Sequence, residues 1–150
     1  MTVVVVSGGF DPVHCGHLDL FEQARKLGDY LLVIVNRDEF LIRKKGYAFM
    51  PLADRRRIIR ELSIVNEVVA SIDDDDTVCA TLRMLCAVPS MRPNVFANGG
   101  DRASHDSPER PVCEELGIRM VDGLGPKVRS SSTLVANIKE TQRGRAELAS

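Results

Sequence analysis

Two histidines lie three residues apart, at His14 and His17, in a glycine-rich stretch near the start of the chain. On the first turn of a helix, residues at this spacing point to the same side. The free N–H groups of a helix start suit phosphate, and two imidazoles placed there can donate hydrogen bonds to phosphate oxygens. The stretch also contains Gly8, Gly9, Phe10, Asp11 and Gly16. It predicts a phosphate-binding turn; the alternatives are a turn with two exposed histidines, or a metal pair that lacks a suitably spaced third ligand.

A basic segment follows further along the chain, where Lys44 and Lys45 precede Gly46. We expect these residues to form a loop that is free to fold over a triphosphate, with a solvated basic turn as the alternative. Three arginines occupy positions 55–57 shortly afterwards. They cannot all face one ligand if this segment is helical, because neighbours on a helix diverge by about 100°.

Two later clusters also have the composition of ligand-binding turns. The run Gly99-Gly100-Asp101-Arg102 follows an apolar run, and its backbone groups could read a base edge or form an ordinary turn. Lys127 and Arg129 precede three serines at 130–132 and then a helical pattern. Hydroxyls and free N–H groups at a helix start bind phosphate. A simple serine cap is the alternative, but it would explain one serine rather than three with two cations.

Four consecutive aspartates at positions 73–76 form the most acidic segment. They could hold Mg²⁺ through their carboxylates. We favour the alternative, in which they cap the helix predicted to follow them and interact with its dipole. His105 and Cys113 belong to no motif, and we expect both to be structural or surface residues.

Apolar runs alternate with helical patterns along the chain, and these elements must position the polar clusters. The runs fall at 3–6, 31–35, 68–70, 95–97 and 118–121. Their continuous apolar character is typical of parallel strands buried on both faces. Apolar residues at helical spacing fall at 18–27, 58–62, 78–85, 111–116 and 134–138. We predict an α/β fold with a doubly wound, Rossmann-like, five-stranded parallel sheet and helices on both faces, which binds ligands beyond the carboxyl ends of its strands.

Composition and charge indicate a single soluble domain. The chain has 150 residues, of which 44% are hydrophobic, and a formal net charge of −1. This balance gives no general attraction for nucleic acid or for a membrane surface. The first apolar run is too short for a membrane span and the four cysteines form no CxxC pair, so we expect a reduced, cytoplasmic setting. We predict one domain over residues 1–140 and a polar C-terminal tail over residues 141–150.

The glycine-rich stretch with its HxGH motif resembles the signature of the cytidylyltransferase-like nucleotidyltransferase superfamily, and later segments resemble that superfamily in the same order. Residues 24–29 and 36–38 are similar to the same region of heptose-1-phosphate adenylyltransferases and glycerol-3-phosphate cytidylyltransferases. Residues 44–46 and 51–55 resemble the stretch where these enzymes carry a phosphate-contacting Lys and Arg. Residues 98–101 resemble the adenylyltransferase KGGD element, with Asn98 in place of its Lys, and residues 127–132 resemble the Ser/Thr-rich motif that opens the last helix.

The resemblance implies that residues 1–140 form a nucleotidyltransferase domain. The implied catalytic residues are His14, His17, Lys44, Lys45 and Arg129. Nucleotide contacts are implied for Gly8, Gly9, Phe10, Asp11, Gly16, Arg55, Asn98, Gly99, Gly100, Asp101, Ser130, Ser131 and Ser132. Mg²⁺ is expected to arrive on the NTP phosphates, and Asp11 could either contact it or orient a histidine. A homodimer is also implied.

The expected reaction moves a nucleoside monophosphate from ATP or CTP to a phosphorylated sugar or polyol and releases pyrophosphate. The GGD element favours an adenylyltransferase that acts on a sugar phosphate. The alternatives are a cytidylyltransferase for glycerol phosphate or a related alcohol phosphate, and an FMN adenylyltransferase. A different class of protein, a nucleotide-binding regulator without turnover, is the remaining alternative.

Overall fold

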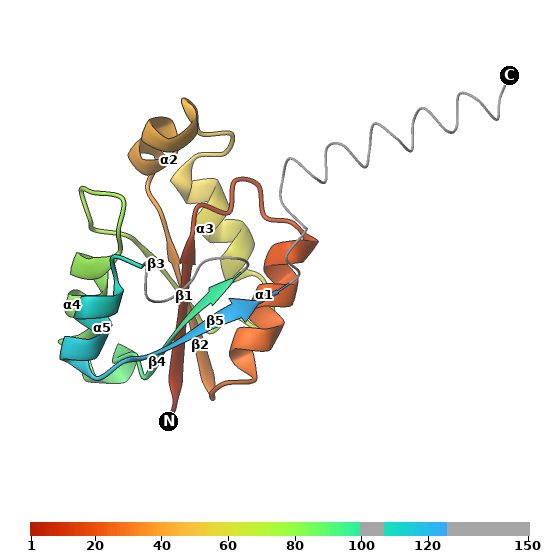
Figure 1. The fold of residues 1–150 in the computed structure, drawn as a ribbon. Coiled ribbons are helices and arrows are strands. Elements are labelled where there is room, and N and C mark those ends of the chain that lie inside the picture. The colour runs from red at the N-terminus through yellow and green to blue at the C-terminus, as the bar shows by residue number, and fades with distance from the viewer. Residues whose placement is uncertain (100–106, 126–150) are drawn as a thin grey trace, which may run out of the picture.

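The computed structural model describes residues 1–99 and 107–125, and within them it contains a five-stranded parallel sheet (Figure 1). The strands are β1 (Val3–Gly8), β2 (Tyr30–Val35), β3 (Glu67–Ala70), β4 (Val95–Gly99) and β5 (Arg119–Leu124). Their order in the sheet is β3-β2-β1-β4-β5, and every pairing is parallel. The predicted α/β fold with a five-stranded parallel sheet is confirmed.

The two central strands are apolar on both faces, which is why their sequences do not alternate. β1 and β2 run in register from Val3 opposite Tyr30 to Gly8 opposite Val35. Val4 and Val6 point into the core on one face, and Val3 and Val5 point into the core on the other. Each face of the sheet therefore needs its own covering layer of helices.

Helices cover both faces, as predicted (Figure 1). α1 (Cys15–Arg25) and α3 (Leu52–Arg60) pack on one face, where they contribute Phe21, Ala24 and Ile59 to the core. α4 (Cys79–Cys86) and α5 (Arg110–Leu116) pack on the other and contribute Leu82, Leu85 and Val112. A short 3₁₀ turn, η1 (Pro89–Met91), links α4 to β4.

The predicted basic loop is wrong, because Lys44 and Lys45 form the last turn of a helix, α2 (Asp38–Lys45). Acidic residues in its first turn and basic residues in its last turn favour its dipole. Gly46 ends the helix in the left-handed conformation, with φ of 87°, and its N–H bonds to the carbonyl of Ile42. Leu41 is the one buried residue of α2, so the helix stands at the edge of the molecule rather than over the sheet.

The carboxyl ends of β1, β2 and β3 bring the first polar clusters to one edge of the sheet. β1 leads into residues 9–17, which we call the HxGH turn. β2 leads into Asn36, and β3 leads into Ser71. The strand order reverses between β1 and β4, and this reversal is where doubly wound folds bind their ligands. Among the residues described, no helix is long and apolar enough to cross a membrane. Gly100, Asp101, His105 and residues 126–150, with the predicted last helix and tail, lie outside them.

Candidate active site

The two histidines of the HxGH motif form the N-terminal cap of α1. His14 is the N-cap residue, and its Nδ1 accepts a hydrogen bond from the Gly16 N–H at 3.1 Å. The Nδ1 atom of His17 accepts one from the His14 N–H at 3.2 Å. The two rings stack with their centroids 3.9 Å apart. Since each Nδ1 is an acceptor, the proton of each neutral ring lies on Nε2, where it can be donated to a ligand.

The environment of His17 holds its ring in the neutral form. Burial, assisted by the charge of His14, lowers the pKa of His17 to about 4. Phe10 contributes to this burial, because its ring meets the ring of His17 edge to face at 5.0 Å. At neutral pH His17 is therefore a donor through Nε2 and not a cation.

The glycines at the end of β1 have a packing role. A Cβ atom on Gly8 would lie 2.9 Å from the ring of Phe10, and one on Gly9 would lie 2.7 Å from the side chain of Leu41. Phe10 itself is buried and has a positive φ of 51°. The sequence pattern predicted that these glycines contact a ligand. In the structure, both positions need a glycine because a side chain there would collide with Phe10 or Leu41.

The carboxylate of Asp11 is fully used by the protein. Its Oδ1 accepts from the Met50 N–H at 2.6 Å, and its Oδ2 accepts from the Phe49 N–H at 2.7 Å and lies 3.0 Å from the Lys45 ammonium. Burial alone would raise the pKa of Asp11, but the bonds from Lys45, Phe49 and Met50 outweigh it and the pKa lies below its usual value. The side chain is 1% exposed, so Asp11 fits neither a metal ligand nor a residue that orients a histidine.

Of the two lysines, Lys45 lies at the HxGH turn. Its ammonium donates to the backbone carbonyl of Asp11 at 3.1 Å and lies 5.0 Å from the ring centre of Tyr47. The Lys44 ammonium lies 5.6 Å from the ring centre of Phe40, on α2 itself. The structure therefore brings Lys45, and not Lys44, next to the residues around His14.

Arg55 is a positioning residue in this structure, which corrects its prediction as a direct phosphate contact. Its side chain is completely buried. The guanidinium donates to the carbonyls of Gly9, Asn36 and Met50 at 2.9, 2.6 and 2.9 Å. It also donates to the carboxylate of Asp38 at 2.6 Å. These bonds join the HxGH turn, the end of β2 and the start of α2, which the sequence pattern did not reveal.

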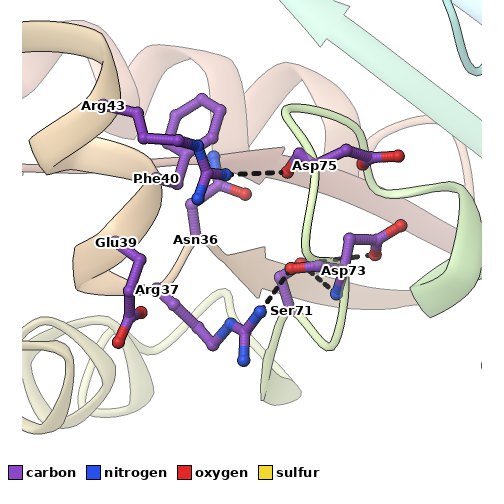
Figure 2. Close-up of a pocket in the computed structure, with 8 residues that line it drawn as sticks. All are labelled: Asn36, Arg37, Glu39, Phe40, Arg43, Ser71, Asp73 and Asp75. Carbon is purple, nitrogen blue, oxygen red and sulfur yellow. Dashed lines mark hydrogen bonds between the residues drawn. The ribbon is translucent and has the colours of Figure 1, made fainter.

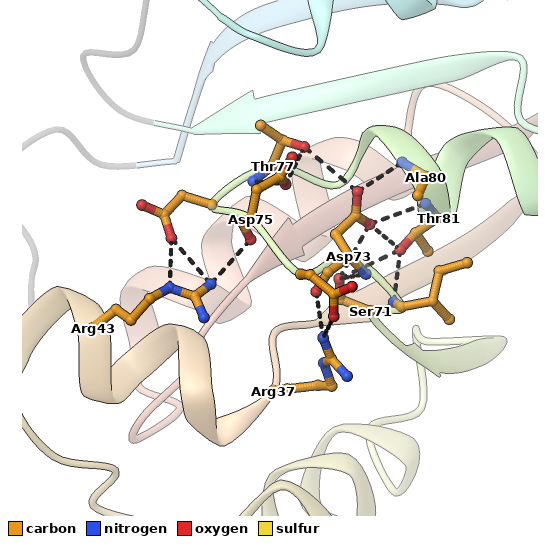
Figure 3. A network of polar contacts seen from close by, with 11 residues as sticks. Arg37, Arg43, Ser71, Asp73, Asp75, Thr77, Ala80 and Thr81 are labelled. Carbon is orange, nitrogen blue, oxygen red and sulfur yellow. Dashed lines mark hydrogen bonds and ion pairs between the residues drawn. The ribbon is translucent and has the colours of Figure 1, made fainter.

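One residue of the acidic segment, Asp73, caps α4 as the favoured alternative expected, whereas the other three aspartates make different contacts (Figure 3). Asp73 accepts from the N–H groups of Ala80 and Thr81 at 2.7 and 3.0 Å. Asp74 pairs with Arg37 of the turn before α2 at 2.9 Å. Arg43 of α2 pairs with Asp76 at 3.2 Å and donates to the carbonyl of Asp75. No group of three or more metal-ligating side chains occurs in the described part of the chain.

A narrow polar pocket lies between α2 and the loop that follows β3 (Figure 2). It is lined by Asn36, Arg37, Glu39, Phe40, Arg43, Ser71, Asp73 and Asp75. The Asn36 N–H bonds to the carbonyl of Gly8 at 2.9 Å, so the pocket begins one strand away from the HxGH turn. The sequence singled out the aspartates and, through the segment 36–38, Asn36 and Arg37, but it did not indicate Glu39, Phe40, Arg43 or Ser71.

The nucleotide side of the predicted site is described only in part. Asn98 is buried at the end of β4, and its amide donates to Asp122 of β5 at 3.1 Å. A Cβ atom on Gly99 would lie 3.3 Å from the carbonyl of Leu124, so this end of β4 packs closely against β5. The other predicted contacts, Gly100, Asp101, Arg129, Ser130, Ser131 and Ser132, lie outside the described residues and remain predictions.

Comparison with known proteins shows the family of this chain. The family model described as cytidylyltransferase-like matches residues 5–123. The bifunctional protein HldE of Streptomyces coelicolor is 41% identical over 95% of this chain, which spans 29% of that protein. The FAD synthase of Ferroglobus placidus is 33% identical over 79% of this chain and 72% of its own length. A glycerol-3-phosphate cytidylyltransferase of Bacillus subtilis is 39% identical over 46% of this chain and 54% of its own.

A solved structure supports the fold. The lipopolysaccharide core biosynthesis protein of Thermoplasma volcanium superposes with a TM-score of 0.66 over 84% of this chain and 98% of its own, at 23% identity. Fold and HxGH turn together define the class of nucleotidyltransferases. Within that class, the chain belongs to the cytidylyltransferase-like family.

Proposed function

We propose that this chain transfers a nucleoside monophosphate from an NTP, with ATP favoured, to a sugar phosphate and releases pyrophosphate. The observation that carries the proposal is the stacked His14–His17 pair at the start of α1, together with the ammonium of Lys45, which is bound to Asp11 three residues before His14. This arrangement supplies two imidazole donors and a cation from α2, which suits a group that gains negative charge as it reacts.

In the proposed reaction a phosphate oxygen of the acceptor attacks the α-phosphorus of the NTP. A new P–O bond forms in line with the bond to the β-phosphate, which breaks, and pyrophosphate leaves with the electron pair. No covalent enzyme intermediate is needed, so catalysis consists of positioning and charge stabilisation. His14 and His17 stabilise the α-phosphate, and Lys45 binds the departing phosphates.

Mg²⁺ enters the proposal as a companion of the NTP, because the side chains fit it poorly. The carboxylate of Asp11 is saturated by three donors, and Asp73 is occupied in capping α4. When bound to the NTP, Mg²⁺ would neutralise phosphate charge. We assign no protein ligand to it.

The polar pocket beside α2 supports a sugar phosphate as the acceptor. Asn36 and Glu39 supply side-chain groups that hydrogen-bond hydroxyls, and Phe40 supplies an apolar ring. The pocket is narrow, so a sugar would lie across its mouth, with its phosphate toward the HxGH turn. The 41% identity to HldE over most of the chain also favours the adenylyltransferase reading of the GGD element.

FMN is the second candidate acceptor, and one observation favours it. Tyr47 and Phe49 lie on the loop between α2 and α3, and they are 59% and 65% exposed. Exposed aromatic rings of this kind can stack on a planar ring system. The identity to an FAD synthase over 79% of the chain agrees with this alternative.

A pyrophosphate-release screen of the four NTPs against a panel of acceptors tests the proposal. The panel contains sugar 1-phosphates, glycerol 3-phosphate and FMN. We expect release with ATP and a sugar phosphate, and a smaller or absent signal with FMN. If FMN is the only acceptor that gives pyrophosphate release, the acceptor is FMN and not a sugar phosphate. If release requires CTP and glycerol phosphate, both proposed substrates are wrong.

A further inference from the structure

The outward face of α3 carries three arginines around a shallow hollow. Ala53, Arg56, Arg57 and Arg60 are spaced three and four residues apart, so they share one side of the helix, and Glu61 completes the lining. The opposite side of α3 packs inward through Arg55 and Ile59. This surface, which we call the α3 arginine face, is therefore distinct from the HxGH turn.

The arginines of the α3 arginine face have no ion-pair partner among the residues that the structure describes. Arg56, Arg57 and Arg60 form no ion pair with any residue in the described ranges 1–99 and 107–125. The Nε atom of Arg56 is buried and has no hydrogen-bond partner there. Like charges at this spacing repel, and a buried donor without an acceptor is costly. The folded chain thus maintains a cluster of cations that nothing in the described structure neutralises.

We propose that the α3 arginine face binds a small polyphosphate anion, such as pyrophosphate or the phosphate chain of a nucleotide, at a site separate from the active site. Guanidinium groups match phosphate oxygens through paired N–H donors, which makes arginine the suited residue for this ligand. The small side chain of Ala53 leaves room between the arginines. The hollow has a volume of about 420 Å³, within the range of small-molecule sites.

A small anion fits this face better than a nucleic acid does. A strand of nucleic acid needs a basic stripe that extends along its backbone. Here Asp54 and Glu61 flank the arginines on the same helix, and the net charge of the chain is −1. The positive region is therefore short, and it matches a ligand with two or three phosphates.

Calorimetric titration with inorganic pyrophosphate tests the proposal. The titration uses the Lys45→Ala variant as background, because this change weakens any binding of pyrophosphate at the active site. In that background, Arg56→Gln with Arg60→Gln should weaken pyrophosphate binding at least tenfold. Arg119→Gln serves as the matched control, since it removes an exposed arginine from β5 and should change the affinity less than twofold.

Thermal melts of the double variant show whether a loss of pyrophosphate binding could come from misfolding. The double variant removes repelling charges from a surface, so its melting temperature should equal or exceed that of the background, and added pyrophosphate should raise it less. Equal affinity in the double variant and the background would overturn the proposal. An equal loss in the Arg119→Gln control would also overturn it, as would binding of a single-stranded oligonucleotide that depends on Arg56 and Arg60 while pyrophosphate binding does not. None of these results depends on turnover, so the proposed reaction is tested separately.

Discussion

The protonation state of the half-buried His17 ring determines which interaction the HxGH turn can make with a phosphate. Burial and the neighbouring His14 lower its pKa to about 4, so it is neutral at the pH of a cell. Because its Nδ1 accepts the His14 N–H, its one proton points away from the cap on Nε2. In our proposal His17 is a fixed hydrogen-bond donor toward phosphate, and its donor state should persist well below pH 6.

The same pKa shift predicts how stability depends on pH. An unfolded histidine has a pKa of about 6.5. Because the folded pKa is lower, protons bind more readily to the unfolded chain between pH 6.5 and pH 4. The free energy of unfolding therefore has its full contribution from His17 above pH 6.5 and loses that contribution as the pH falls toward 4. Between pH 7 and pH 4.5 the wild type should lose about 2–3 kcal/mol more unfolding free energy than His17→Asn, whose side chain can still accept the His14 N–H. Urea denaturation at both pH values measures this, and parallel losses in the two proteins would refute the assignment.

The two lysines at the end of α2 should behave differently on substitution. Lys45→Ala removes the ammonium next to the HxGH turn, so kcat/KM for the NTP should fall about tenfold or more. It also leaves the buried Asp11 without its ion pair, which should cost about 1 kcal/mol of stability. Lys44→Ala should change kcat/KM by less than about threefold and stability by less than about 0.5 kcal/mol. Steady-state kinetics and melts of both variants check this; equal kinetic effects would show that Lys45 has no special position.

The motif in the sequence predicts which residues gather at the HxGH turn but not all of their partners. His14 and His17 are found by spacing alone, because three residues along a helix fix their common direction. The role of Asp11 depends on Phe49 and Met50, which lie 38 and 39 residues further along. Contacts at this separation are set by the packing of α2 and α3, so no local pattern could reveal them.

At the scale of elements, α2 is held by polar contacts rather than by a hydrophobic face. Arg37 and Arg43 bind the acidic loop before α4 (Figure 3). Asp38 binds the buried Arg55 of α3. Since Leu41 is its one buried residue, hydrophobic burial contributes little. The position of Lys45 therefore depends on ion pairs and on the Arg55 bonds.

Replacing Arg55 tests whether these bonds hold the elements together. Arg55→Met leaves the carbonyls of Gly9, Asn36 and Met50 without their donor, and each buried acceptor left unsatisfied costs about 1–3 kcal/mol, so we expect a total loss of about 3 kcal/mol or more. Arg57→Met, on the exposed side of the same helix, should change the unfolding free energy by less than about 0.5 kcal/mol. Chemical denaturation of the two variants measures the difference. A loss for Arg55→Met no larger than the loss for Arg57→Met would contradict the positioning role.

The strands could be predicted from their apolar pattern and α2 could not, for one physical reason. Strands buried on both faces leave continuous apolar runs, such as the one at 31–35, whereas α2 buries too little to show a helical period. Its signals were acidic residues Asp38 and Glu39 at the start, basic residues at the end, and Gly46 as the stop. Read together, these end signals would have identified the helix.

At the scale of the whole molecule, the HxGH turn follows the central strand β1, with two strands of the sheet on each side of it. β2 and β3 carry the polar pocket on one side of β1, and β4 and β5 carry Asn98 and Gly99 on the other. In our proposal the acceptor occupies the first side and the nucleotide the second, so the α-phosphate meets the acceptor at α1. In the proposed reaction, residues that follow or end β1, β2, β3 and β4 therefore act together.

Phosphorus NMR of the reaction gives the most direct test of this account, with ATP and the sugar phosphate found in the pyrophosphate screen. The wild type should form a nucleoside diphosphate sugar, in which a phosphoanhydride bond joins the α-phosphorus to the sugar phosphate, with one pyrophosphate released per product. His17→Ala should lower kcat about 100- to 1,000-fold, because it removes one preorganised donor from the transition state, while KM for ATP changes less than about threefold. Pyrophosphate release without the coupled product, or near-normal kcat in His17→Ala, would contradict the central claim.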